Sequence, residues 1–144
     1  MSGYLLDTDI ISELWKRRPN PAVVSWVNSQ DPGQLFLSVM TLAEIKLGAL
    51  RLKPRDRRRS DRLLEMAATI PEEYGDRVLL VDAAVAGVWA AINANRSRPV
   101  VDTILAATAI SNQLTLVTRN TADFEDVDVK LYNPFLEGFT GGGG

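Results

Sequence analysis

The residue types with the clearest chemistry in this sequence are carboxylates spaced far apart along the chain. The candidate catalytic residues are Asp7, Glu44, Asp102 and Asp123. Several carboxylates at one place repel one another unless a cation lies between them. Carboxylates without histidine or cysteine suit hard ions such as Mg²⁺ or Mn²⁺. Such an ion can turn water into a nucleophile and steady the leaving oxygen of a phosphodiester.

Each acid also has a purely structural explanation. Asp7 and Asp102 each precede or open a predicted helix, where aspartate is a favoured N-cap. The spacing Thr41-x-x-Glu44 is that of a capping box, and Asp123 fits an exposed turn. Asp82 fits a helix cap in the same way, and we assign it no other role. Only the joint position of the four acids favours a site.

Composition removes several classes of enzyme. The 144 residues contain no histidine and no cysteine, which excludes Ser-His-Asp triads, thiol nucleophiles and thiolate zinc sites. The net charge of −2 does not indicate a nucleic-acid-binding protein, although the local distribution of charge matters more for such binding than the total. No apolar stretch approaches the roughly 18 residues of a membrane helix, and the start lacks the basic region of a signal peptide. We expect a cytoplasmic protein with no membrane association.

Short apolar runs alternate with helical patterns, which predicts an α/β fold around a mostly parallel sheet. The predicted strands are Tyr4–Leu6, Leu35–Leu37, Val78–Val81, Leu114–Val117 and Leu131–Tyr132. The predicted helices between them begin at Thr8, Pro21, Thr41, Pro54, Ala83 and Val101. Residues 1–136 form one predicted domain, and 137–144 a flexible Gly-rich tail. Sites in such sheets gather beyond the carboxyl ends of the strands, where three of the four acids fall.

Four stretches carry a resemblance to a known family. "LLDTDIISE", "LSVMTLAEIKLGALRL", "DTILAATAI" and "LTLVTRNTADF" resemble the signature stretches of PIN-domain ribonucleases, and more narrowly the VapC and FitB-like toxins of bacterial toxin–antitoxin pairs. The resemblance runs from about Tyr4 to Pro134. It implies a three-layer α/β/α fold and Mg²⁺- or Mn²⁺-dependent endoribonuclease activity on RNA. It also implies a homodimer, alone or in a larger toxin–antitoxin hetero-oligomer, and a cognate VapB-like antitoxin that blocks the active site.

The resemblance assigns roles residue by residue. Asp7 and Asp102 match the metal-binding aspartates, and Glu44 matches the acid that orders the metal and the attacking water. The fourth acidic position falls on Asn120 or Asp123. The polar positions expected to support the acids are Thr8, Asp9, Ser38, Thr118 and Asn120. Two features depart from the family pattern: Asp9 stands where asparagine is usual, and the stretch from Arg98 to Asp102 is slightly shorter.

The densest positive run is "RLKPRDRRRSDR" from Arg51 to Arg62, with seven Lys or Arg against two Asp. It is either a solvated helix face or an electrostatic surface for an RNA backbone or an acidic partner segment. The residues assigned to that surface are Arg55, Arg57, Arg58 and Arg59. Apolar surfaces at Leu47-Leu50 and Leu63-Leu64 could form a groove that clasps an antitoxin helix, and an antitoxin arginine could pair with the acids.

Two alternatives compete with the nuclease. An apolar strand followed by Asp-x-Asp, as in "YLLDTD", also begins haloacid-dehalogenase-like phosphatases, but their late acidic pair is replaced here by Thr118-Arg119-Asn120. The second alternative is a catalytically silent PIN scaffold that binds RNA or protein. Loss of an acid usually marks such scaffolds, and here all four acids are present.

Overall fold

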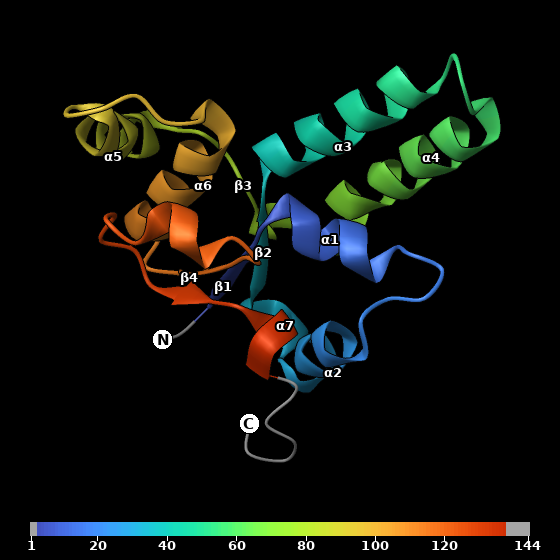
Figure 1. The fold of residues 1–144 in the computed structure, drawn as a ribbon, viewed down its shortest axis with the longest axis horizontal. Helices are drawn as coiled ribbons and strands as arrows, with labels where there is room; N and C mark the ends of the chain where they lie inside the picture. Colours follow the sequence, from blue (N-terminus) through green and yellow to red (C-terminus); the bar gives the residue numbers. More distant parts are fainter. Residues whose placement is uncertain (1–2, 138–144) are drawn as a thin grey trace.

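The computed structural model describes residues 3–137, and its centre is a sheet in which every pairing is parallel. The strands are β1 (Tyr4–Leu6), β2 (Leu35–Ser38), β3 (Val78–Leu79), β4 (Thr115–Val117) and β5 (Leu131–Tyr132). Their order across the sheet is β3-β2-β1-β4-β5 (Figure 1). In register, Leu5 of β1 lies opposite Phe36 on one side and Leu116 on the other. The predicted α/β fold with a parallel sheet is confirmed.

Helices connect the strands, as parallel pairing requires. The α-helices are α1 (Thr8–Leu14), α2 (Pro21–Ser29), α3 (Val39–Leu52), α4 (Arg57–Tyr74), α5 (Ala83–Asn93), α6 (Val100–Ser111) and α7 (Pro134–Glu137). Short 3₁₀ turns are η1 (Pro32–Gln34), η2 (Gly75–Arg77) and η3 (Thr121–Phe124). Gly75 follows α4 with φ +54°, a left-handed conformation that glycine adopts without the steric penalty of a Cβ.

Two apolar clusters cover the two faces of the sheet. Leu6 and Val117 point to one face and pack with residues of α1, α2, α3, α4 and α7. Leu5 and Leu116, one position earlier on the same strands, point to the other face and pack with α6. This alternation follows from the two-residue period of a strand. The result is the expected three-layer α/β/α arrangement, with α5 and α6 on one side of the sheet (Figure 1).

The strand order reverses direction at β1. From β1 the chain proceeds outward to β2 and β3, and then crosses back to β4 and β5 on the other side. Such a reversal opens a crevice at the carboxyl ends of the two strands that flank it, which is where ligands bind in open α/β sheets. Here those strands are β1 and β4, followed by Asp7 and Thr118.

Helices α3 and α4 pack antiparallel and form an arm that projects from the sheet (Figure 1). The Asp56 carboxylate caps α4 by accepting from the backbone N–H of Arg59 at 3.1 Å. The fully buried Ser60 hydroxyl donates to the Ala49 carbonyl at 2.6 Å. This bond joins the two helices and satisfies one of the end carbonyls of α3, which lack partners within the helix.

Several local predictions from the sequence are wrong. The proposed Thr41–Glu44 capping box does not exist, because α3 begins at Val39 and Ser38 caps it, its Oγ accepting from Met40 N–H at 3.0 Å. Asp102 is not a cap, since it lies in the first turn of α6 after the N-cap Pro99. Helix α4 begins at Arg57 rather than Pro54, and β3 ends at Leu79 rather than Val81. Asp7 and Asp82 do cap α1 and α5.

Within residues 3–137, no helix is long and apolar enough to cross a membrane. The predicted Gly-rich tail lies, from residue 138 onward, outside the described residues.

The buried hydroxyl in the arm generates a stability prediction. Ser60→Ala removes the donor from the Ala49 carbonyl and should lower the free energy of unfolding by about 1 kcal/mol, the loss of a buried hydrogen bond less the better helix propensity of alanine. The matched control is Thr69→Ala on the same helix, whose exposed hydroxyl donates only to the Met66 carbonyl and whose loss should be nearly neutral. Urea denaturation of both variants checks this, and equal stabilities would contradict it.

Candidate active site

Asp7 lies at the carboxyl end of β1 with both carboxylate oxygens hydrogen-bonded. Oδ1 accepts from the backbone N–H of Thr8 at 2.6 Å, and Oδ2 accepts from the Thr118 hydroxyl at 2.8 Å. The Asp7 N–H donates to the Val117 carbonyl at 2.9 Å, continuing the β1–β4 ladder. With 8% of its surface exposed, the residue is both the N-cap of α1 and the floor of the crevice between the two strands.

The surroundings of Asp7 disfavour its charged form. Burial raises the pKa of the Asp7 carboxyl to about 7, and the charges of Asp9 and Asp102 act in the same direction. Hydrogen bonds from Thr118 and Thr8 oppose this shift of the pKa. A buried carboxylate with two acidic neighbours holds more negative charge than the crevice can stabilise, and a bound cation would relieve it.

Asp9, on the first turn of α1, adds a third carboxylate to the crevice. Its Oδ1 atom is buried and has no hydrogen-bond partner among the described residues. Burial raises the pKa of Asp9, and the Asp102 charge acts in the same direction, whereas the backbone N–H and positive charge of Arg119 lower it. The Arg119 guanidinium lies 4.0 Å from the centre of the Phe135 ring, which helps to hold it beside the site. A buried oxygen without a partner is uncommon and calls for an explanation such as a ligand.

Glu44 reaches the crevice from α3, which follows β2. The Thr8 hydroxyl donates to Glu44 Oε1 and lies 3.3 Å from the Thr41 hydroxyl. Thr41 is fully buried in the first turn of α3. The two threonines therefore fix the Glu44 carboxylate beside the start of α1, and Glu44 has a partner in the site rather than the cap bond expected from the sequence.

Asp102 and Asp123 come from the later half of the chain. Asp102 is half-buried on the first turn of α6, and burial raises the pKa of its carboxyl, with the charges of Glu44 and Asp123 acting in the same direction. Asp123 is exposed on η3. Asn120 is exposed as well, and its backbone N–H donates to the Thr118 hydroxyl at 3.1 Å. Of the two candidates for the fourth position, Asp123 is the one whose charge acts on Asp102.

The supporting residues divide into two kinds. Thr8 and Thr118 bond directly to the acids, whereas Ser38 only caps α3 and so acts through the position of that helix. Two residues near the acids escaped the sequence analysis. The spacing of Thr41 and Glu44 predicts a capping box, whereas in the structure the buried Thr41 hydroxyl faces that of Thr8. Arg119 belongs to the quoted stretch "TRN", but its effect on Asp9 depends on the β1–β4 pairing, which no local pattern encodes.

The donor set fits a hard divalent cation. Among residues 3–137, no three acidic side chains are close enough to form a ready metal cage. Mg²⁺ does not need one, because it keeps several waters and is commonly bound through one or two carboxylates. Two observations agree with a cation site. One Asp9 oxygen has no hydrogen-bond partner among the described residues, and the pKa values of Asp7 and Asp102 are raised by burial and by neighbouring acids.

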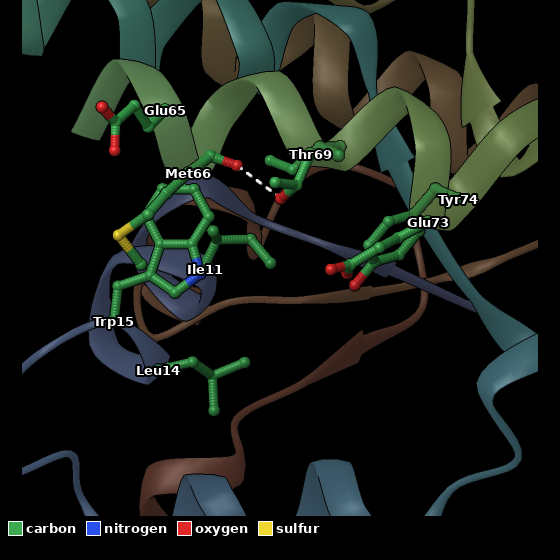
Figure 2. A pocket seen from close by; sticks show the side chains of 9 residues that line it. Ile11, Leu14, Trp15, Glu65, Met66, Thr69, Glu73 and Tyr74 are labelled. Atoms are coloured by element: carbon green, nitrogen blue, oxygen red, sulfur yellow. Dashed lines mark hydrogen bonds between the residues drawn. The ribbon is translucent and has the colours of Figure 1, made fainter. Parts of the chain in front are cut away.

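A groove leads from the site along the arm. Its near end is lined by Thr8 and Glu44 together with Arg59, Arg62 and Met66. It continues between α1 and α4, where Trp15 lies beneath Met66 and the wall extends through Thr69 to Tyr74 (Figure 2). Apolar side chains such as Ile11, Leu14 and Ile70 line the part between α1 and α4, and the near end carries Glu44 with two arginines of α4, Arg59 and Arg62.

The raised pKa of Asp7 generates a pH prediction for metal-free protein. The folded-state value of about 7 lies above the ordinary 3.8, so the folded state binds the proton more tightly. Stability should therefore fall as pH rises through this window, by on the order of a few kcal/mol. Asp7→Asn removes this titration and still caps α1.

The stability advantage of Asp7→Asn over the wild type, measured in EDTA, should be small near about pH 4 and largest near about pH 8. The control Asp82→Asn, an exposed cap outside the site, should follow the wild type at every pH. If Asp7→Asn also runs parallel to the wild type, Asp7 does not titrate in this window.

Comparison with known proteins places the chain. The PIN domain family matches residues 4–130. The chain is 35% identical to toxin FitB of Neisseria gonorrhoeae over 91% of its own length and 97% of that protein. It is 33% identical to VapC ribonuclease Y4jK of Sinorhizobium fredii, with 91% and 96% covered. The crystal structure of FitAcB from Neisseria gonorrhoeae superposes with a TM-score of 0.84 at 33% identity, covering 92% of this chain and 99% of that one. The chain therefore belongs to the PIN domain family.

Proposed function

We propose that this protein is a metal-dependent endoribonuclease toxin of a toxin–antitoxin pair. The observation that carries the proposal is that carboxylates from four separate segments act on one another's charge around the β1–β4 crevice, with a buried Asp9 oxygen left without a partner among the described residues. Two relatives support a ribonuclease toxin, since one is named toxin FitB and the other VapC ribonuclease Y4jK. Family membership decides against the haloacid-dehalogenase alternative.

In this proposal Asp7 and Asp102 hold Mg²⁺ or Mn²⁺. The ion supplies positive charge that stabilises the scissile phosphate and makes water a better nucleophile. Glu44, held by Thr8, orients the attacking water and accepts its proton. Asp9 adds negative charge that strengthens cation binding, and Asp123 adds a further negative charge from η3. Thr118 keeps the Asp7 carboxylate aligned through its hydrogen bond.

The RNA backbone would approach along the arm. The acids of the site repel the RNA phosphates, so positively charged side chains must offset that repulsion along the path to the site. Arg59 lines the same groove end as Glu44, and Arg55, Arg57 and Arg58 are exposed around the α3–α4 turn. These arginines therefore form the proposed electrostatic surface that guides a single strand toward the crevice.

The groove between α1 and α4 is the proposed antitoxin seat. Its apolar side chains suit one face of an amphipathic helix or an extended apolar segment, and its near end is lined by the site residue Glu44. An arginine of the antitoxin would pair with these acids in a bidentate fork and take the place of the cation. The solved structures of FitAcB and of FitAB bound to a DNA fragment, each 33% identical to this chain, support the choice of a protein partner. Homodimerisation, alone or within a larger toxin–antitoxin assembly, is part of the same proposal.

The central experiment separates the three functional classes. Purified protein freed of metal is titrated with Mn²⁺ and assayed on single-stranded RNA and on a phosphomonoester. Cleavage of RNA that requires the ion supports the proposal. RNA binding without cleavage indicates a silent scaffold, and phosphomonoester turnover would reinstate the phosphatase.

Site variants should separate catalysis from folding. Asp102→Asn should lower the RNA cleavage rate by orders of magnitude with the fold intact, because it removes half of the proposed ion ligands. Glu44→Gln keeps an acceptor for the Thr8 hydroxyl, so stability should change little while the rate falls, typically by 10²- to 10⁴-fold for a lost general base. Asp82→Asn is the matched control and should cleave at the wild-type rate. Wild-type cleavage by either site variant would overturn that residue's role.

The basic surface gives a salt-dependent prediction. Reversing Arg57, Arg58 and Arg59 to glutamate should weaken binding of RNA, of antitoxin, or of both, more strongly at low salt, where exposed charges are least screened. Binding is measured by fluorescence anisotropy in the non-cleaving Asp102→Asn background at two salt concentrations. Lys130→Glu, an exposed change away from the arm, is the control. Affinities that stay at the control value at both salts contradict the assignment.

A further inference from the structure

Arg98 and Asp126 form a two-pronged ion pair on the side of the molecule that carries α6. Nη1 of Arg98 lies 2.8 Å from Oδ1 of Asp126, and Nη2 lies 2.8 Å from Oδ2. The Arg98 side chain is only 10% exposed, although Asp126 is 53% exposed. Arg96 also approaches Asp126, but through one contact of 3.6 Å and with 60% of its side chain exposed. The first pair has the planar bidentate geometry of a strong Arg–carboxylate contact, and the second does not.

The pair joins the two segments that carry Asp102 and Asp123. Arg98 lies in the connection between α5 and α6, four residues before Asp102, and Asp126 follows η3, three residues after Asp123. The start of α6 is fixed on its other side by Thr103, whose hydroxyl accepts from Trp89 Nε1 at 2.9 Å. Val101, Phe124 and Val127 belong to one apolar cluster beneath these segments.

Those two segments carry charges of the same sign into the site. The Asp123 charge is felt at Asp102, together with that of Glu44. Repulsion of this kind drives the first turn of α6 away from η3 whenever no cation lies between them. An attractive contact between the two segments that carry the acids opposes that separation, and the Arg98–Asp126 pair is such a contact.

Stability alone is a poor explanation for the arrangement. An ion pair with a well-exposed partner contributes little to the free energy of unfolding, because water screens its charges. Here Nε of Arg98 is buried without a hydrogen-bond partner among the described residues, which is itself unfavourable. If the pair instead holds the two segments at a fixed separation, both its bidentate geometry and the burial of Arg98 but not of Asp126 are explained.

We infer that Arg98 and Asp126 are positioning residues that hold Asp102 and Asp123 at the separation required for cation binding. The inference rests on the proposed metal site and adds two residues that touch neither the ion nor RNA. We call the Arg98–Asp126 pair the clamp. It holds Asp102 and Asp123 in place before the cation binds, so less of the binding free energy is lost in bringing them together. Lysine cannot replace Arg98 fully, because an ammonium makes a point contact where the guanidinium makes a fork.

The test measures Mn²⁺ affinity directly, by calorimetry on metal-free protein. Arg98→Gln and Asp126→Asn should each weaken Mn²⁺ binding by about tenfold or more, the usual effect of losing a partner that orients metal ligands. Arg98→Lys should fall between them and the wild type, and the swap Arg98→Asp with Asp126→Arg should recover part of the loss. The matched control Arg96→Gln removes the weaker contact to the same carboxylate and should bind Mn²⁺ like the wild type. In cleavage assays at saturating Mn²⁺, kcat should fall in Arg98→Gln while the KM for RNA stays unchanged.

Hydrogen exchange on metal-free protein gives an independent readout. The Thr103 amide bonds to the Pro99 carbonyl, and the Val127 amide to the Phe124 carbonyl. Both should exchange faster in Arg98→Gln than in Arg96→Gln. Unchanged Mn²⁺ affinity in Arg98→Gln, beside a wild type that binds the ion, overturns the clamp and leaves the proposed function standing. A wild type that neither binds Mn²⁺ nor cuts RNA refutes the proposed function, and unchanged exchange at the two amides then refutes the clamp as well.

Discussion

The carboxylates of Asp7, Asp9 and Asp102 repel one another across the end of the β1–β4 pair, and much of the surrounding structure offsets that repulsion. Thr118 and the start of α1 bond to Asp7, Arg119 supplies positive charge to Asp9, and two threonines orient Glu44. The pKa of Asp7 nevertheless stays raised to about 7, chiefly because the carboxyl is buried and in part because of the charges of Asp9 and Asp102. A parallel sheet can bear this strain because strands buried on both faces hold their ends rigidly.

The sequence predicts the architecture because its signals are local. Apolar triplets such as Tyr4–Leu6 alternate with helical patterns, and aspartates before helices mark real caps at Asp7 and Asp82. Boundaries fail where two local signals compete. Thr41-x-x-Glu44 has the spacing of a capping box, but Ser38, three residues earlier, also fits an N-cap and begins the helix in the structure. The side chain of the buried Thr41 therefore faces Thr8, which lies 33 positions earlier in the chain.

The candidate site is only partly visible in the sequence, for a related reason. Acid types and strand ends indicate which residues could gather, and the signature stretches support the same set. Which polar groups bond to them depends on strand order, since Thr118 reaches Asp7 only because β4 lies beside β1. The Arg98–Asp126 contact spans 28 positions between two irregular segments, and no periodicity or motif connects them. Such contacts are set by the completed fold.

The pairing of β1 with β4 also affects when the site can fold during synthesis of the chain. Tyr4 lies opposite Thr115, so β1 leaves the ribosome long before β4, one of its two neighbours in the sheet, has been synthesised. Until β4 and η3 have been synthesised, Asp7 lacks the Thr118 hydroxyl and the crevice lacks one of its walls. Nascent chains stopped before this point, and fragments cut from the C-terminal side by proteases, carry most of the residues but no assembled crevice. The crevice can therefore assemble only after both β4 and η3 have been synthesised.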